Sequence, residues 1–68
     1  MVVKVGDGVV DEWRESGVEP QVGIVVEYDS TPNIAFPYKV WWAGNGSIWG
    51  YGEDEVLEMR EAYEKYRL

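Results

Sequence analysis

The 68-residue sequence predicts an all-β fold, a small barrel of five short strands followed by a short C-terminal helix or helical tail. Runs of β-branched and aromatic residues recur along the chain, separated by segments rich in glycine, proline and aspartate, which is the pattern of short strands joined by turns. Between residues 38 and 51, two aromatic runs flank a glycine-rich reversal at residues 43–46, as in a pair of antiparallel strands. A small barrel is the simplest architecture for such strands.

The first half of the chain contains two predicted strands and a long loop. Residues 2–10 are rich in valine around a glycine–aspartate–glycine turn, which predicts a bent strand or a strand with a tight turn. Residues 11–21 are polar and predict a long loop, which carries Trp13. Residues 22–28 are the clearest strand, and Gly23 inside it indicates a bulge or a close backbone approach. The residues on one face of this strand are Val22, Ile24, Val26 and Tyr28.

Two further strands form the predicted aromatic hairpin. Residues 36–42 predict the third strand, in which Pro37 is tolerated because it lies near the end. Residues 47–51 predict the fourth strand. Gly50 and Gly52 flank its last tyrosine and permit the sharp coiling that closes a small barrel.

The end of the chain predicts the closing strand and the tail. Residues 53–55 are acidic and predict a turn, after which residues 56–59 predict a short fifth strand. Residues 60–68 are good helix formers and predict a short helix or helical tail. The barrel is therefore expected to cover residues 1–59.

Composition limits the possible functions. The chain has no cysteine and no histidine, so a disulfide scaffold is excluded and stability must come from aromatic packing or oligomerisation. A net charge of −7 repels phosphate backbones, so we expect no nucleic-acid partner. No apolar run approaches the length of a membrane span, and we expect a soluble protein without a membrane or targeting segment.

Several motifs follow one another along the predicted strands, namely Val5-Gly6-Asp7-Gly8-Val9, Gly23-Ile24-Val25, Tyr38-Lys39-Val40-Trp41-Trp42, Trp49 and Glu53-Asp54-Glu55-Val56-Leu57-Glu58. The order of the strands resembles the SH3-like barrel, and the motifs are similar to those of small SH3-like proteins encoded by tailed bacteriophages. The first two motifs are also similar, more weakly, to the KOW-type barrels that bind RNA. The resemblance implies a five-stranded SH3-like barrel and a virion or phage–host setting, with localisation in the host cytoplasm or the virion. The acidic loops of this chain disfavour the RNA role of the KOW class.

Catalytic groups are scarce. Without histidine or cysteine, most pairs of nucleophile and base are absent, and a barrel of this size offers no deep cleft to shift the pKa of a carboxylate. The acidic residues 53–55 lack the spacing of a calcium loop and predict a capped turn instead. We therefore expect a non-enzymatic protein with no cofactor and no metal.

The aromatic residues are the candidate binding site. Alternation places Lys39 and Trp41 on one face of the third strand, and because Lys39 should face water, we expect Trp41 to be exposed. Trp49 and Tyr51 share one face of the next strand, and a one-residue choice of register decides whether they join Trp41 outside or fill the core. The residues expected in the core are Tyr38, Val40, Trp42 and Ile24.

We expect these aromatic residues to serve protein binding, because aromatic side chains are favoured anchors of interfaces. The predicted site consists of Trp41, Trp49, Tyr51, Trp13 and Lys39. The leading hypothesis is an interaction or assembly protein, with self-association as a natural part of it. Two alternatives are an SH3-type module that recognises proline-rich peptides, and an acidic mimic of nucleic acid that inhibits a basic host protein.

Overall fold

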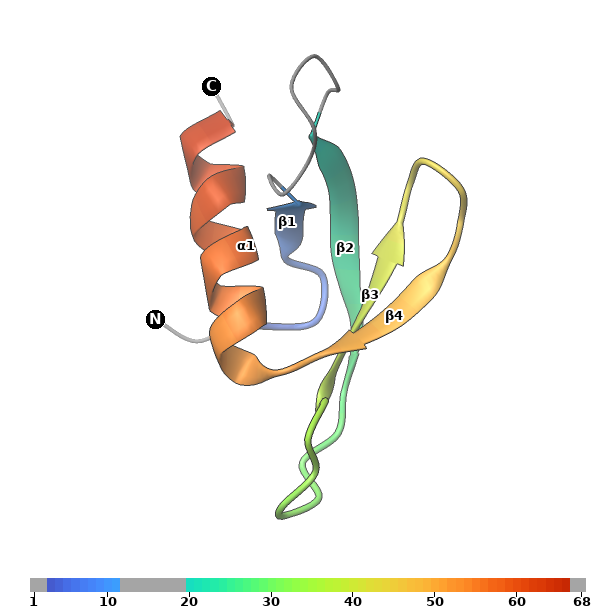
Figure 1. Ribbon diagram of the computed structural model, residues 1–68, viewed down its shortest axis with the longest axis vertical. Coiled ribbons are helices and arrows are strands. Elements are labelled where there is room, and N and C mark those ends of the chain that lie inside the picture. Colours follow the sequence, from blue (N-terminus) through green and yellow to red (C-terminus); the bar gives the residue numbers. More distant parts are fainter. Residues whose placement is uncertain (1–2, 12–19, 67–68) are drawn as a thin grey trace.

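A computed structural model describes residues 3–11 and 20–66 (Figure 1). These residues form a four-stranded antiparallel sheet with the strand order β1-β2-β3-β4, followed by one C-terminal helix, α1. Each strand pairs with the next strand in sequence. The elements are β1 (Gly8–Asp11), β2 (Gln21–Tyr28), β3 (Tyr38–Trp42), β4 (Ile48–Tyr51) and α1 (Glu53–Tyr66).

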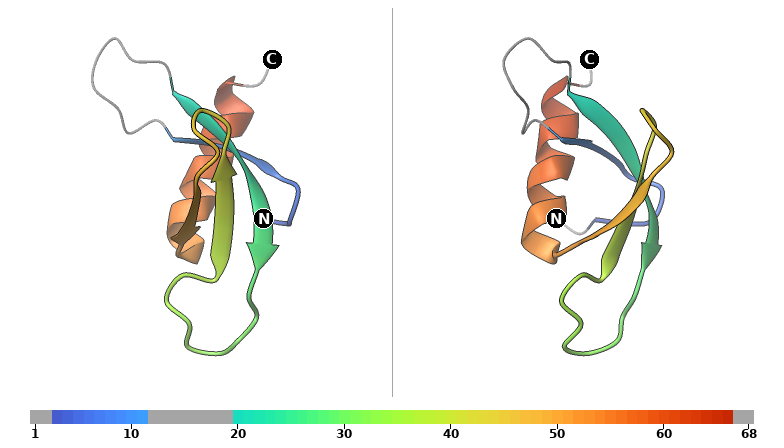
Figure 2. Two further views of the ribbon diagram at one scale, coloured as in Figure 1. Left: turned by 90° about the vertical axis from the view of Figure 1, so that its right-hand side faces the viewer. Right: turned by 45° about the vertical axis from the view of Figure 1, so that its right-hand side comes forward.

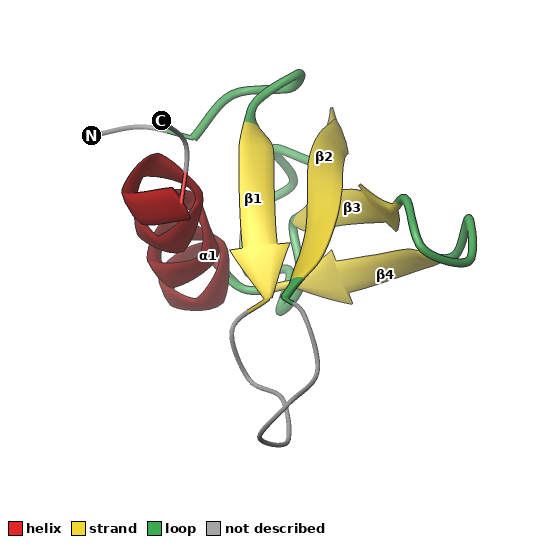
Figure 3. Ribbon diagram, turned by 90° about the horizontal axis from the view of Figure 1, so that it is seen from above, coloured by secondary structure: helices red, strands yellow, loops and turns green. Residues whose placement is uncertain are grey.

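The sheet is strongly twisted, and α1 lies against one side of it. Seen from above, β3 and β4 run at a steep angle to β1 and β2 (Figure 3), and two further views show the sheet curling beside the helix (Figure 2). A register shift between Val25 and Glu27 interrupts the pairing of β2 with β3. Such a bulge increases the local twist, which brings the β3–β4 hairpin across the other two strands.

The helix α1 begins with a capped acidic turn. Val56 donates the first helical hydrogen bond to the carbonyl of Gly52, and the Gly52 amide donates to Oε1 of Glu55 at 3.1 Å. Three acidic side chains occupy the first turn, where they interact favourably with the positive end of the helix dipole. The capped acidic turn thus starts a helix.

The predicted fifth strand at residues 56–59 is wrong, because these residues lie within α1. The boundary expected between residues 59 and 60 therefore falls inside the helix. In place of a fifth strand, α1 contacts β1 along the side that β2 leaves open. Arg60 fixes this contact, because its guanidinium donates to the carbonyl of Gly8 at 3.2 Å and lies 3.8 Å from the carboxylate of Asp7.

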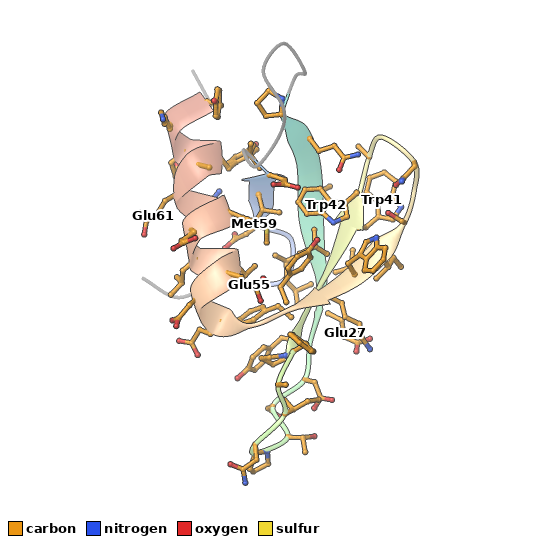
Figure 4. All side chains as sticks on the ribbon, in the orientation of Figure 1. Glu27, Trp41, Trp42, Glu55, Met59 and Glu61 are labelled. Atoms are coloured by element: carbon orange, nitrogen blue, oxygen red, sulfur yellow. The ribbon has the colours of Figure 1, made fainter. Side chains whose placement is uncertain are left out.

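The core lies between the sheet and α1. Its fully buried side chains are all valines, one from each of β1, β2, β3 and α1, namely Val9, Val25, Val40 and Val56. Tyr38 and Trp42 are buried beside them, which confirms the prediction for these two residues and for Val40. Figure 4 shows Trp42 on the side of β3 that faces Met59 of α1, while Trp41 lies farther from the helix.

Both sides of β1 are covered. Val9 and Val10 are neighbours and point to opposite sides of the strand, yet both are buried. Val9 joins the core cluster, whereas Val10 lies beside Tyr63 and Tyr66 of α1 in a shallow apolar recess. The helix thus reaches around the edge of β1, and this explains why a strand of four residues can be fixed at the margin of the sheet.

Candidate functional site

Three exposed apolar side chains form a row across the sheet, on the face that points away from the core. Trp41 of β3 is paired with Ile24 of β2 on one side and with Ile48 of β4 on the other. Their exposed fractions are 42% for Ile24, 36% for Trp41 and 57% for Ile48. Side chains that are directly opposite on neighbouring strands contact one another. We call this side of β2, β3 and β4 the outer face.

Further apolar side chains extend the outer face in both directions. Val22 precedes Ile24 by two residues, so it points to the same side of β2, and it is exposed. Phe36 lies over Gly50 at the other end, since a Cβ atom built on Gly50 would lie 3.2 Å from Cβ of Phe36. Phe36 is 58% exposed. The outer face therefore presents a patch of aliphatic and aromatic side chains larger than isolated exposed residues would give.

Lys39 adds a polar border to this patch. It lies two residues before Trp41 on the same side of β3, and its ammonium nitrogen is 3.1 Å from Oε2 of Glu27. Both side chains of this ion pair are about half exposed. An apolar centre with a polar, solvated rim is the usual anatomy of a protein interface.

Trp41 is exposed, which confirms the prediction for this residue. The other aromatic residues of the predicted site lie in different places. Trp49 and Tyr51 are paired with Val40 and Tyr38, so both point to the side of β4 that faces the core. Tyr51 packs against the core, whereas Trp49 does not. Trp49 is 62% exposed, and its Nε1 donates to the hydroxyl of Ser47 at 3.2 Å.

Tyr51 is a structural residue more than a surface residue. Its hydroxyl accepts a hydrogen bond from Nε1 of Trp42 at 3.0 Å, and the two rings meet edge to face. Burial raises the pKa of the Tyr51 hydroxyl, against the smaller opposing effect of the hydrogen bond from Trp42. Trp13, the remaining predicted site residue, lies outside the described residues.

The assignment of Ile24 to the core is wrong, because its side chain is exposed, and neither Ile24 nor Ile48 was predicted to take part in binding. In β2 the alternating set that contains Ile24 is entirely apolar, whereas the other set contains Gln21 and Glu27, so alternation favours the wrong face as the inner one. Gly23 provides a usable signal. It is paired with Trp42, and a Cβ atom built on it would lie 2.7 Å from the Trp42 ring, so the set that contains Gly23 and Val25 faces the core.

The described residues contain no group of three or more acidic side chains placed to hold a metal ion. Among their carboxylates the one resolved pKa shift is a lowered pKa of Asp29, caused chiefly by the hydrogen bond from the Thr31 hydroxyl. Within the described part of the chain, no helix is long and apolar enough to cross a membrane.

Comparison of the chain with protein-family models, with curated proteins and with solved structures gives no match. The geometry of the outer face is therefore the main basis for a functional proposal.

Proposed function

We propose that the chain is a non-enzymatic protein-binding module of a larger assembly, and that the outer face is its docking surface. The observation that carries this proposal is the exposed row of Ile24, Trp41 and Ile48 on three adjacent strands. An apolar patch with a tryptophan at its centre favours association, because aromatic anchors contribute most of the binding free energy at interfaces. Each Å² of apolar area that these side chains remove from water on binding would contribute about 25 cal/mol of favourable free energy.

Charge restricts the kind of partner. The chain carries a net charge of −7, and at the border of the patch the positive charge of Lys39 is compensated by Glu27. We therefore propose a partner protein with an apolar surface and a neutral or basic rim, and neither nucleic acid nor a membrane. The absence of histidine and cysteine from the sequence supports a binding role over a catalytic one.

The setting of the assembly rests on the resemblance to small SH3-like phage proteins. We propose a virion or a phage–host complex, with the protein in the host cytoplasm or the particle. The meander of four antiparallel strands supports a relation to the SH3-like barrel, with α1 beside β1 in place of the expected fifth strand.

Photo-cross-linking in the cells that naturally make the protein tests the proposal. A p-benzoylphenylalanine side chain is placed at Trp41 and, as the control, at Glu61, an exposed residue on the side of α1 that points away from the sheet (Figure 4). We expect protein adducts at position 41 and few at position 61. Trp41→Ala should then weaken binding of the purified partner by about 30-fold, the effect of losing a hot-spot residue worth about 2 kcal/mol.

Equal adducts at the two positions, or unchanged affinity of Trp41→Ala for the partner, would refute docking through the outer face. An adduct with a short proline-rich segment would instead favour an SH3-type peptide-recognition module. Titration of a proline-rich, arginine-flanked peptide against tryptophan fluorescence would confirm that result.

A further inference from the structure

The free edge of β4 has backbone groups ready to pair with another strand. In the β3–β4 ladder Trp42 donates to the carbonyl of Ser47, and Trp41 is paired with Ile48. Because hydrogen-bonded pairs alternate along an antiparallel ladder, the N–H and C=O groups of Ile48 and Gly50 point away from β3. Within residues 3–11 and 20–66, no hydrogen bond reaches these outward groups.

The opposite edge of the sheet is protected. The carbonyl of Gly8 also points outward from β1, and it accepts a hydrogen bond from Arg60 of α1. The ring of Tyr63 lies over Gly8, since a Cβ atom built there would lie 2.6 Å from ring carbons of Tyr63. Proteins commonly protect edge strands with charged side chains or with a covering element. The edge of β1 has a charged side chain and a covering helix, whereas among the described residues neither kind of protection lies at the edge of β4.

The sequence around β4 removes the electrostatic barrier to pairing. Residues 40–52 contain no aspartate, glutamate, lysine or arginine, although the whole chain carries a net charge of −7. Two copies of so acidic a protein repel each other, and they approach most easily where each is uncharged. A basic partner would find nothing to attract it in this stretch, so the uncharged edge suits a second copy of the same chain.

We propose that two copies pair antiparallel through β4, which joins their sheets into one. The register that uses all the outward groups of the strand places Ile48 opposite Gly50 of the second copy, and the reverse, so that each pair exchanges both of its hydrogen bonds. Trp49 then lies opposite Trp49 of the second copy, in a non-hydrogen-bonded pair with Cα atoms about 4.5 Å apart. This arrangement is isologous, as in most symmetric dimers.

The same register buries two apolar side chains that are more than half exposed in the single chain. Trp49, 62% exposed, meets its counterpart across the two-fold axis. Ile48, 57% exposed, lies opposite Gly50 of the second copy, where it meets the Phe36 side chain that lies over this glycine. The outer faces of the two copies then lie side by side on one continuous sheet. The inference concerns the edge of the sheet and goes beyond docking on the outer face.

Cysteine cross-linking tests the register, because the chain has no cysteine of its own. Trp49→Cys places two sulfurs across the proposed axis at a Cα separation that suits a disulfide. Trp41→Cys is the matched control, an exposed tryptophan replaced one strand away from the edge. Under mild oxidation we expect Trp49→Cys to form a linked dimer and Trp41→Cys to do so roughly tenfold more slowly, since pairing raises the effective concentration at position 49 alone.

A second measurement uses the unmodified protein and does not depend on Trp49. Light scattering should show a dimer as the concentration rises towards millimolar. Over the same range, hydrogen exchange of the Ile48 and Gly50 amides should slow, while the Trp49 amide, bonded to β3 in the monomer, should not change.

A strict monomer at millimolar concentration, or equal cross-linking of the two cysteine variants, would overturn the inference. Faster linking of Trp41→Cys would also overturn it and would show that copies meet through the outer face. Failure of the β4 pairing leaves docking on the outer face standing, because that proposal depends on the response to Trp41→Ala.

Discussion

Gly23→Ala should destabilise the fold strongly, although it adds one methyl group. Gly23 lies in β2, where the added Cβ would lie 2.7 Å from the Trp42 ring, 2.7 Å from Cγ1 of Val40 and 2.9 Å from the carbonyl oxygen of Trp41. Carbon atoms in contact prefer about 3.5–4.0 Å. Two of these neighbours are buried core side chains and the third is backbone, so the strands must separate to admit the methyl group.

The magnitude follows from this geometry. Overpacking a well-packed core costs about 1–3 kcal/mol, and three neighbours that cannot yield place this site in the upper part of that range. Replacing glycine by alanine returns about 0.4–1 kcal/mol, because it reduces the freedom of the unfolded chain. The net loss is about 2 kcal/mol, which lowers the Tm of a domain this size by about 8–16 °C.

Thermal unfolding followed by far-UV circular dichroism and tryptophan fluorescence measures this loss. One protein concentration is used throughout, because self-association would make the Tm depend on concentration. Gly44→Ala is the control: its close neighbour is the end of the flexible Gln21 side chain, at 2.8 Å, and the backbone of Gly44 is not in the left-handed region. We expect the control to change stability by less than about 0.5 kcal/mol. Equal Tm values for the two variants would refute the close approach of β2 and β3 at Gly23.

Four further predictions concern polar groups. Arg60→Ala should lower the free energy of unfolding by about 2 kcal/mol in urea titrations, because the hydrogen bond from its largely buried guanidinium to β1 is lost. A loss under about 0.5 kcal/mol would contradict the role of Arg60 in fixing α1 against β1. Lys39→Ala, which removes an exposed ion pair, should cost less than about 0.5 kcal/mol in the same assay. Burial raises the pKa of Tyr38 and Tyr51, so the folded state binds these two protons more tightly than the unfolded state does. The free energy of unfolding should therefore keep its full value below pH ~10, the pKa of an unfolded tyrosine, and should fall as the pH rises through the raised pKa values of the folded state. Tyr51→Phe should cost about 1 kcal/mol at neutral pH, because the indole of Trp42 loses its acceptor, and should make the alkaline loss smaller in urea titrations at rising pH.

The aromatic hairpin was predictable because its signals are local. Period-two alternation alone separates Trp41 from Trp42, and Lys39 identifies the side that faces water. The paired strands and the reversal at residues 43–46 follow from the same short stretch of sequence, where turn chemistry and alternation agree. The exposed centre of the candidate site could therefore be predicted from five residues of β3.

The start of α1 was missed although its signals are present. Three features here are typical of a helix start. They are a glycine at the cap, three acidic residues in the first turn, and apolar residues at helical spacing, namely Val56, Met59 and Tyr63. Residues 56–59 alone read equally well as a short strand, and the expected barrel favoured that choice. A longer window would have found the helix.

The placement of Trp49 could not have been predicted from alternation. Trp49 and Tyr51 point to the same side of β4, and alternation assumes that side chains on one face share one environment. The twist of the sheet carries Trp49 beyond the core while Tyr51 stays over Trp42. Burial here depends on how far the core extends along the strand, which is a property of the whole fold.

The contact of α1 with β1 joins segments that lie far apart in the sequence, since Arg60 and Gly8 are 52 residues apart, and this has a consequence during synthesis. The helix that covers β1 leaves the ribosome only after all four strands have left it. Until α1 emerges, the nascent chain exposes both sides of β1, and both margins of the growing sheet can pair with a neighbouring nascent chain. Translation that ends before residue 53 would give a chain in which β1 is uncovered, which is a route to aggregation that α1 closes.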